Sequence, residues 1–192
     1  MAKRVMILAL ALLFVIPAMS FAKDMTGKWG LGYFSNDAPV GARFWVNEKV
    51  GVDLGVGFSA NGYVVSEGAP PDVTYSTETA TSFWVDLGVP YVVFPSDRAN
   101  FFVRPGVVFG IIDDMDPDLG TQTVDETWTQ ITVSLTPGAE VFFGEHFSLE
   151  AGHGIALDLT TPPDAINGGE STTDIRTFDA SVTYLGFHFY FK

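Results

Sequence analysis

The clearest pattern in the sequence is an alternation of apolar residues with small or charged ones over residues 50–58, which read VGVDLGVGF. A period of two predicts a β-strand with one wholly apolar face. A soluble β-sandwich would bury that face and show bulky polar residues to water. A small membrane barrel instead needs an apolar outer face and a crowded interior of glycine and charge. The pattern therefore favours a membrane barrel.

Seven further segments carry the same alternation with varying regularity. They lie at residues 28–34, 40–46, 83–91, 101–111, 131–143, 147–157 and about 176–191. The sequence therefore predicts an all-β fold, an eight-stranded antiparallel up-and-down transmembrane β-barrel. An even number of strands brings both ends of the chain to one side of the membrane, which we expect to be the periplasmic side.

The lengths of the connections agree with this count, because such barrels have short periplasmic turns and longer outer loops. The expected short turns lie at residues 47–49, 95–100 and 144–146. The expected outer loops lie at residues 59–80, 113–126 and 160–174, with a brief first one at residues 35–39.

Three prolines, Pro90, Pro105 and Pro137, fall inside expected strands. A closed barrel has no edge strand on which a missing amide hydrogen would be harmless. We therefore expect bulges at these prolines, or positions near the periplasmic rim. Gly106 and Gly138 follow two of them and lower the cost of local irregularity.

The N-terminal segment predicts export. A basic pair at residues 3–4 precedes an apolar run over residues 5–15 and a small-residue site at residues 20–22. This arrangement predicts a cleaved signal peptide over residues 1–22, followed by one outer-membrane β-barrel domain over residues 23–192. The apolar run is shorter than the roughly 20 residues that a membrane-spanning helix needs.

Charge and cysteine content narrow the function further. Cleavage would remove two of the ten basic residues and none of the 23 acidic ones, which changes the net charge from −13 to −15. Nucleic acid is therefore not an expected partner. The chain has no cysteine, so hydrogen bonds and packing alone must hold the fold. The three long loops are acidic and lack Lys and Arg, so we expect any contact with lipopolysaccharide to depend on Ca²⁺ or Mg²⁺.

The end of the chain reads LGFHFYFK from Leu185. Every second residue of this segment is large and apolar, and these residues share one face of the expected strand. That face holds Leu185, Phe187, Phe189 and Phe191. It resembles the C-terminal aromatic signal that the barrel-assembly machinery of Gram-negative bacteria recognises, although Lys192 follows the expected terminal Phe. The resemblance implies that this machinery is a partner, with recognition by strand addition.

The whole expected mature chain resembles the small OmpA-like and OmpX-like barrels, the outer membrane protein β-barrel domain group. The resemblance rests on the architecture, on the opening WGLGYF of residues 29–34 and on the ending described above. It implies a bacterial outer-membrane location and an interior that is filled by ion pairs rather than open as a pore.

Parity along the strands places seven charged residues on the inner face. They are Lys28, Arg43, Asp53, Asp86, Arg104, Glu140 and Glu150. Ionised groups in a narrow barrel must be paired or hydrated, so we expect these residues to form one network. If a pore were present instead, the acidic excess would favour cations.

Two weaker motifs could indicate an enzyme or a metal site. His146 and Ser148 have the spacing of the His-x-Ser pair in lipid A deacylases, but they fall at an expected periplasmic turn, whereas those enzymes act at the outer leaflet. Asp114, Asp116 and Asp118 could offer oxygen ligands to Ca²⁺, but the bidentate Glu of a calcium loop is missing. We therefore expect no enzyme, no cofactor and no firm metal site.

These patterns lead to an expected monomeric outer-membrane barrel with a structural or adhesion-like surface role. Its expected partners are outer-membrane lipid, lipopolysaccharide, the assembly machinery and an extracellular partner bound through the loops. Two alternatives stay open. The first is a narrow channel or small apolar-ligand carrier, as in OmpW-like barrels, and the second is a lipid A-modifying enzyme.

Overall fold

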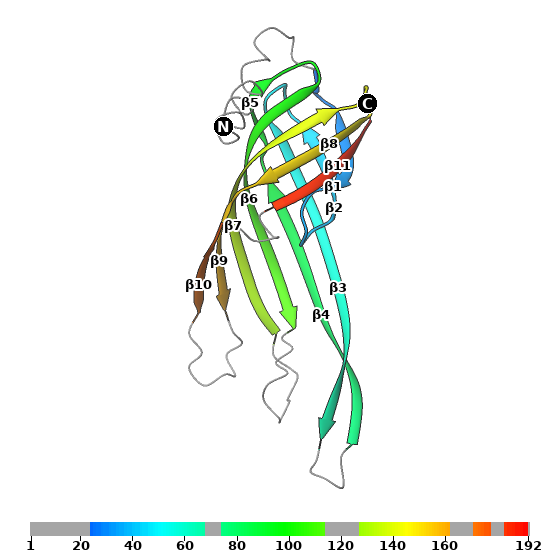
Figure 1. The fold of residues 1–192 in the computed structure, drawn as a ribbon, viewed down its shortest axis with the longest axis vertical. Helices are drawn as coiled ribbons and strands as arrows, with labels where there is room; N and C mark the ends of the chain where they lie inside the picture. Colours follow the sequence, from blue (N-terminus) through cyan, green and yellow to red (C-terminus); the bar gives the residue numbers. More distant parts are fainter. Residues whose placement is uncertain (1–23, 68–73, 114–126, 162–170, 178–182, 192) are drawn as a thin grey trace, which may run out of the picture.

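The computed structural model describes residues 24–67, 74–113, 127–161, 171–177 and 183–191. The predicted signal peptide lies outside these residues. In the described residues the chain forms eleven strand segments and no helix (Figure 1). The segments are β1 (Trp29–Tyr33), β2 (Val40–Trp45), β3 (Gly51–Glu67), β4 (Thr74–Gly88), β5 (Tyr91–Pro95), β6 (Ala99–Asp113), β7 (Thr127–Phe142), β8 (Phe147–His153), β9 (Ile155–Thr161), β10 (Thr172–Arg176) and β11 (Thr183–Phe191). No helix in this part of the chain is long and apolar enough to cross a membrane.

The eleven segments form a closed barrel of eight antiparallel strands, as the sequence predicted. Three strands of the wall consist of two segments each, namely β4 with β5, β8 with β9, and β10 with β11. The barrel closes where β1 pairs with β11, from Trp29 opposite Phe191 to Tyr33 opposite Phe187. We call the end of the barrel that holds Trp29 and Phe191 the terminal end.

The predicted alternation of apolar and polar faces is confirmed on β3. Val52, Leu54 and Val56 are 43–49% exposed on the outer face, whereas Asp53 on the inner face is fully buried. Outward-facing Val, Leu, Ile and Phe recur on the other strands of the wall. This band of apolar side chains matches what a lipid bilayer requires of a barrel exterior.

The prediction of a long loop over residues 59–80 is wrong for most of its length. β3 and β4 continue as a paired hairpin, with Ser59 opposite Ser82 and Glu67 opposite Thr74. The hairpin projects well past the other strands, away from the terminal end (Figure 1). Its sequence lacks apolar alternation, so the pattern that identified the other strands did not extend to it. High β-propensity, from residues such as Thr79 and Thr81, was the remaining signal.

The three prolines are accommodated in the sheet in two different ways. Pro90 lies between β4 and β5, and a register shift follows between Val92 and Phe94, as predicted. At Pro105 and Pro137 the first of the two expected alternatives, a bulge, is wrong, since both residues keep regular register between β6 and β7. The missing amides are tolerated because the neighbouring ladders stop beside them. β4 ends at Gly88, which pairs with Gly106 next to Pro105, and the break between β8 and β9 lies opposite Pro137.

The β1–β2 hairpin is the shortest part of the wall, with strands of five and six residues. Its connecting segment, residues 34–39, turns into the barrel, so that Phe34 and Ala38 are buried. The segment packs on the inner face of β3, where a Cβ on Gly57 would lie 1.8 Å from the Asp37 carbonyl oxygen. Glycine at residue 57 therefore makes room for the segment.

Candidate functional site in the barrel interior

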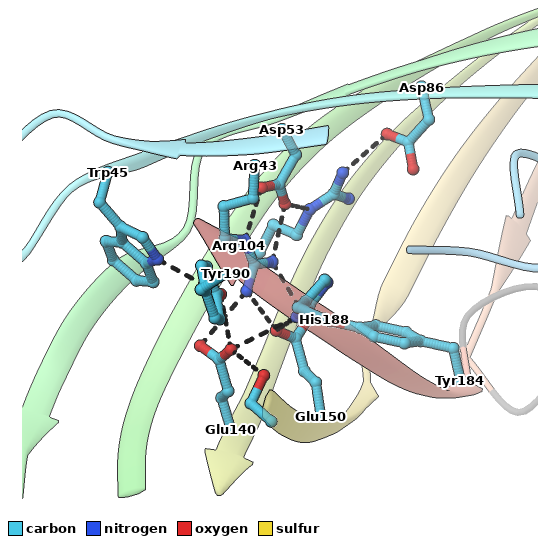
Figure 2. Close-up of polar contacts among 11 residues, drawn as sticks. Arg43, Trp45, Asp53, Asp86, Arg104, Glu140, Glu150, Tyr184, His188 and Tyr190 are labelled. Atoms are coloured by element: carbon cyan, nitrogen blue, oxygen red, sulfur yellow. Dashed lines mark hydrogen bonds and ion pairs between the residues drawn. The ribbon is translucent and has the colours of Figure 1, made fainter. Parts of the chain in front are cut away.

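Arg43 on β2 lies at the centre of the interior (Figure 2). Its backbone is paired with that of Asp53 on β3, which aligns the two side chains. The guanidinium donates from Nε to Asp53 Oδ1 at 2.7 Å and from Nη2 to Asp53 Oδ2 at 2.9 Å. Its Nη1 lies 3.4 Å from Glu140 Oε2 and also donates to Glu150. One buried cation therefore serves three carboxylates from three strands.

Arg104 on β6 extends these contacts toward β4. Its Nε donates to Asp53 Oδ2 at 2.7 Å, and its Nη2 donates to Asp86 Oδ1 at 2.9 Å. Asp53 therefore bridges both guanidinium groups, as Figure 2 shows. We call the connected set the interior ion network; it consists of Arg43, Asp53, Asp86, Arg104, Glu140 and Glu150.

Three further side chains surround the Glu140 carboxylate. Its Oε1 accepts hydrogen bonds from Ser148 Oγ at 2.5 Å and from Tyr190 OH at 2.7 Å, and His188 Nδ1 lies 3.3 Å away. Trp45 Nε1 donates in turn to Tyr190 OH at 3.3 Å. These partners hold the carboxylate in place where water is excluded, which the burial of an ionised group requires.

The last strand, β11, supplies three polar side chains to the site although it contains no Asp, Glu, Lys or Arg. Tyr184, His188 and Tyr190 all point inward from β11, and the Tyr184 hydroxyl donates to Glu150. The period of two along the chain end already predicts that His188 and Tyr190 lie on the face opposite the aromatic one. The same alternation, extended one residue before Leu185, also places Tyr184 on that inner face.

Six of the seven predicted interior residues lie together in the interior ion network. The prediction for Lys28 is wrong, because no ion pair joins it to the network among the described residues. Lys28 precedes β1 at the terminal end, is only half-buried and interacts electrostatically with the exposed Asp24. Its place ahead of the first strand leaves its side chain near solvent rather than in the lumen.

A second charged pair, which the sequence did not predict, lies farther from the terminal end. Asp158 on β9 accepts from Arg176 Nη2 on β10 at 2.5 Å and from Gln130 Nε2 at 3.3 Å. Thr132 also donates to it. The expected strand ended at Leu157, so Asp158 fell one residue outside the segment whose faces were assigned.

A small cavity of about 30 Å³ separates the two charged groups. Asp86 and Arg104 line it from the interior ion network, Arg176 lines it from the second pair, and Phe34 and Asp37 line it from the inward-turned segment. Asp86 Oδ2 is buried and has no hydrogen-bond partner among the described residues.

The terminal end of the lumen is closed by packed side chains. Trp45 and Tyr190 lie against Met25, Val92 and Phe142 in a buried cluster. All five side chains of this cluster are at most 6% exposed.

The other candidate residues have separate environments. His146 Nδ1 lies 3.0 Å from the Tyr190 carbonyl oxygen, whereas Ser148 donates to Glu140, so the two do not form the pair that a deacylase would need. His153, which the alternation of its strand predicts on the outer face, is exposed there, with Nδ1 2.6 Å from Thr183 Oγ1. Asp114, Asp116 and Asp118 lie outside the described residues.

The four residues of the expected assembly signal all face outward from β11. Leu185, Phe187, Phe189 and Phe191 are 72%, 42%, 49% and 43% exposed. Aromatic neighbours surround this face at the terminal end, with Trp29 at 5.3 Å from Phe191 and Phe147 at 5.1 Å from Phe189, measured between ring centroids. Rings in such positions suit a membrane interface.

A barrel with an apolar exterior and a charged, closed interior can be compared with known families. The family described as outer membrane protein beta-barrel domain matches residues 8–185. The chain belongs to this family. It is therefore an integral β-barrel of the bacterial outer membrane, and its apolar band faces lipid. Neither curated proteins nor solved structures gave a match.

Proposed function

We propose that this outer membrane β-barrel protein is a plugged, structural barrel that presents the β3–β4 hairpin as a surface-contact element. The observation that carries the proposal is the interior ion network, which fills the lumen with buried, mutually paired side chains. A filled lumen stabilises the barrel wall and blocks passage through it, so any binding of partners takes place on the outer surface.

The arrangement of the connections supports an orientation with the terminal end in the periplasm. The β2–β3, β5–β6 and β7–β8 connections are short and lie at the terminal end. Barrels of the outer membrane have short turns on the periplasmic side. The β3–β4 hairpin then extends from the cell surface.

The hairpin has a feature suited to binding another chain. β2 pairs with β3 only as far as Val56, so from Gly57 onward no described strand pairs with that edge of β3. An unpaired edge offers backbone donors and acceptors to an extended segment. The proposed extracellular partner is therefore a protein that adds a strand to β3.

Two measurements test this proposal together. In planar lipid bilayers, the purified barrel should give no steady conductance, because the interior ion network blocks the lumen. In a cell-adhesion assay, a variant with residues 61–80 replaced by Asn-Gly should lose binding and keep its folded gel mobility. Steady ohmic channels, or full adhesion by the shortened variant, would contradict the proposal.

A second candidate, a carrier of small apolar ligands, is favoured by one observation. The β1–β2 hairpin is short, so the strands on either side of it extend past its end. Apolar side chains on these strands and at the end of the hairpin are therefore unusually exposed. They are Val40, Phe58, Ile175 and Leu185, which are 66–76% exposed. The inward-turned segment lies behind this part of the wall and lines the cavity.

The carrier candidate has its own test. A fluorescent fatty acid should bind the micelle-embedded barrel saturably, with one site per barrel, and Phe58→Asp should weaken that binding at least several-fold. Phe143→Asp, which introduces the same change at the terminal end, is the matched control. Equal, unsaturable partitioning in all three proteins would exclude the carrier.

A further inference from the structure

The charges of the interior do not balance. The interior ion network holds four carboxylates and two guanidinium groups, so it has two more negative than positive charges when all are ionised. The Asp158–Arg176 pair contains one negative and one positive charge, so it does not offset the excess negative charge of the network. His188 lies 3.3 Å from Glu140 and 3.7 Å from Glu150 and could offset one charge if protonated. One negative charge would still remain.

One carboxylate oxygen of the interior ion network has no partner among the described residues. Asp86 is 1% exposed, and its Oδ1 is paired with Arg104 while its Oδ2 is buried and has no partner among the described residues. Figure 2 shows the second oxygen turned away from Arg104. An ionised oxygen that is buried without a partner is costly. It therefore indicates a missing positively charged or hydrogen-bonding ligand.

The cavity beside Asp86 has the size and chemistry for such a ligand. Its volume of about 30 Å³ exceeds the 10–15 Å³ or so that one water needs. Hydroxyl-bearing Thr132, Ser134 and Thr136 line the same space. Carboxylate, hydroxyl and water oxygens are ligands that hard cations prefer. Both arginines on the wall are already committed, Arg104 to Asp53 and Asp86, and Arg176 to Asp158.

We infer that the cavity binds one small monovalent cation, such as Na⁺, on Asp86 Oδ2 and the neighbouring hydroxyl oxygens. A monovalent ion fits better than Ca²⁺, which takes six to eight oxygens and commonly several carboxylates. Asp86 offers one free oxygen, and Asp37 is the other carboxylate on the wall. Nothing in the proposed structural role requires this ion, so the inference stands apart from it.

The test uses the folded, full barrel in detergent micelles, transferred into choline chloride. Wild-type protein should broaden the ²³Na NMR line, and KCl should compete this broadening away. Its thermal midpoint should rise with the logarithm of NaCl concentration relative to choline chloride at equal ionic strength, because a ligand that binds only the folded state stabilises it by mass action. Asp86→Asn should abolish both effects.

Asp24→Asn is the matched control, since it removes an exposed carboxylate away from the cavity, and it should keep both effects. If Asp86→Asn does not fold, Ser134→Ala keeps the charge and should weaken Na⁺ binding several-fold. The inference is overturned if wild type melts alike in Na⁺, K⁺ and choline without line broadening. It is also overturned if the effects persist in folded Asp86→Asn, or if CaCl₂ alone stabilises the barrel.

Discussion

Arg43 compensates more charge than any other described side chain, because Asp53, Glu140 and Glu150 all meet its guanidinium. The rigid, planar donor set of arginine suits this role better than the point charge of lysine. The ring centroids of Phe34 and Trp45 lie 5.4 Å and 5.7 Å from the Arg43 Cζ atom. These rings further enclose the charge.

Replacing Arg43 should therefore be severe. Arg43→Met leaves three buried carboxylates without their cation, and we expect the free energy of unfolding to fall by about 3–5 kcal/mol. Urea unfolding of the micelle-embedded barrel, followed by tryptophan fluorescence, measures this. Adding Glu150→Gln to Arg43→Met should recover part of the loss, because one buried charge fewer then lacks a partner.

Lys28→Met provides the control for this prediction. Lys28 lies outside the interior ion network and is half-buried beside solvent, so the change should alter stability by no more than about 0.5 kcal/mol. A loss as large as that of Arg43→Met would show that the network has been wrongly delimited.

At the residue scale, sequence parity was informative wherever a strand was correctly bounded. It assigned Arg43, Asp53 and Glu140 to the interior, since each lies between outward apolar residues. It could not show that Arg43 is shared among three carboxylates, because that depends on which strands face each other across the lumen. Lys28 was misplaced because alternation was extended one residue before the strand begins.

At the scale of elements, β11 has two separate tasks. Its inner face contributes Tyr184, His188 and Tyr190 to the interior, and its outer face presents the aromatic residues of the expected assembly signal. Because the side chains of the two faces point to opposite sides of the wall, we expect substitutions on the outer face to leave the interior undisturbed.

Phe191→Ala tests the outer face. If the assembly machinery recognises the outer face of the last strand as proposed, several-fold less assembled barrel is expected in cells, because one of the recognised side chains is removed. Phe143→Ala is the matched control, as Phe143 is also exposed and belongs to the same aromatic group at the terminal end. Unassisted folding into liposomes should be affected similarly by both substitutions. Equal loss of assembly in cells would argue against recognition at Phe191.

The extent of the elements was less predictable than their number. Eight strands followed from alternation, which lipid on one side and packed side chains on the other impose. The outer half of β3 and β4 lies beyond the apolar band, where that constraint ends, so the sequence looked like a loop. The inward turn of residues 34–39 depends on space that Gly55 and Gly57 leave on another strand, which no local pattern reveals.

At the scale of the whole molecule, the closed ladder predicts resistance to detergent. Unboiled protein in sodium dodecyl sulfate should migrate faster on a gel than boiled protein, because a folded barrel is more compact than the unfolded chain. Arg43→Met should convert to the slower form at a lower temperature. Recovery of the protein in the soluble periplasmic fraction, or a single mobility before and after boiling, would contradict an integral barrel.

Closure between β1 and β11 joins parts of the chain that are far apart in the sequence, with Trp29 opposite Phe191. The same strand delivers the hydroxyls of Tyr184 and Tyr190 to Glu150 and Glu140. A barrel still open at this seam would therefore leave both carboxylates short of donors while its lumen began to exclude water. Partly closed intermediates are therefore destabilised by an unpaired strand edge and also by incompletely solvated charges. We expect β1 and β11 to pair in a single cooperative event, which is the slow step of insertion.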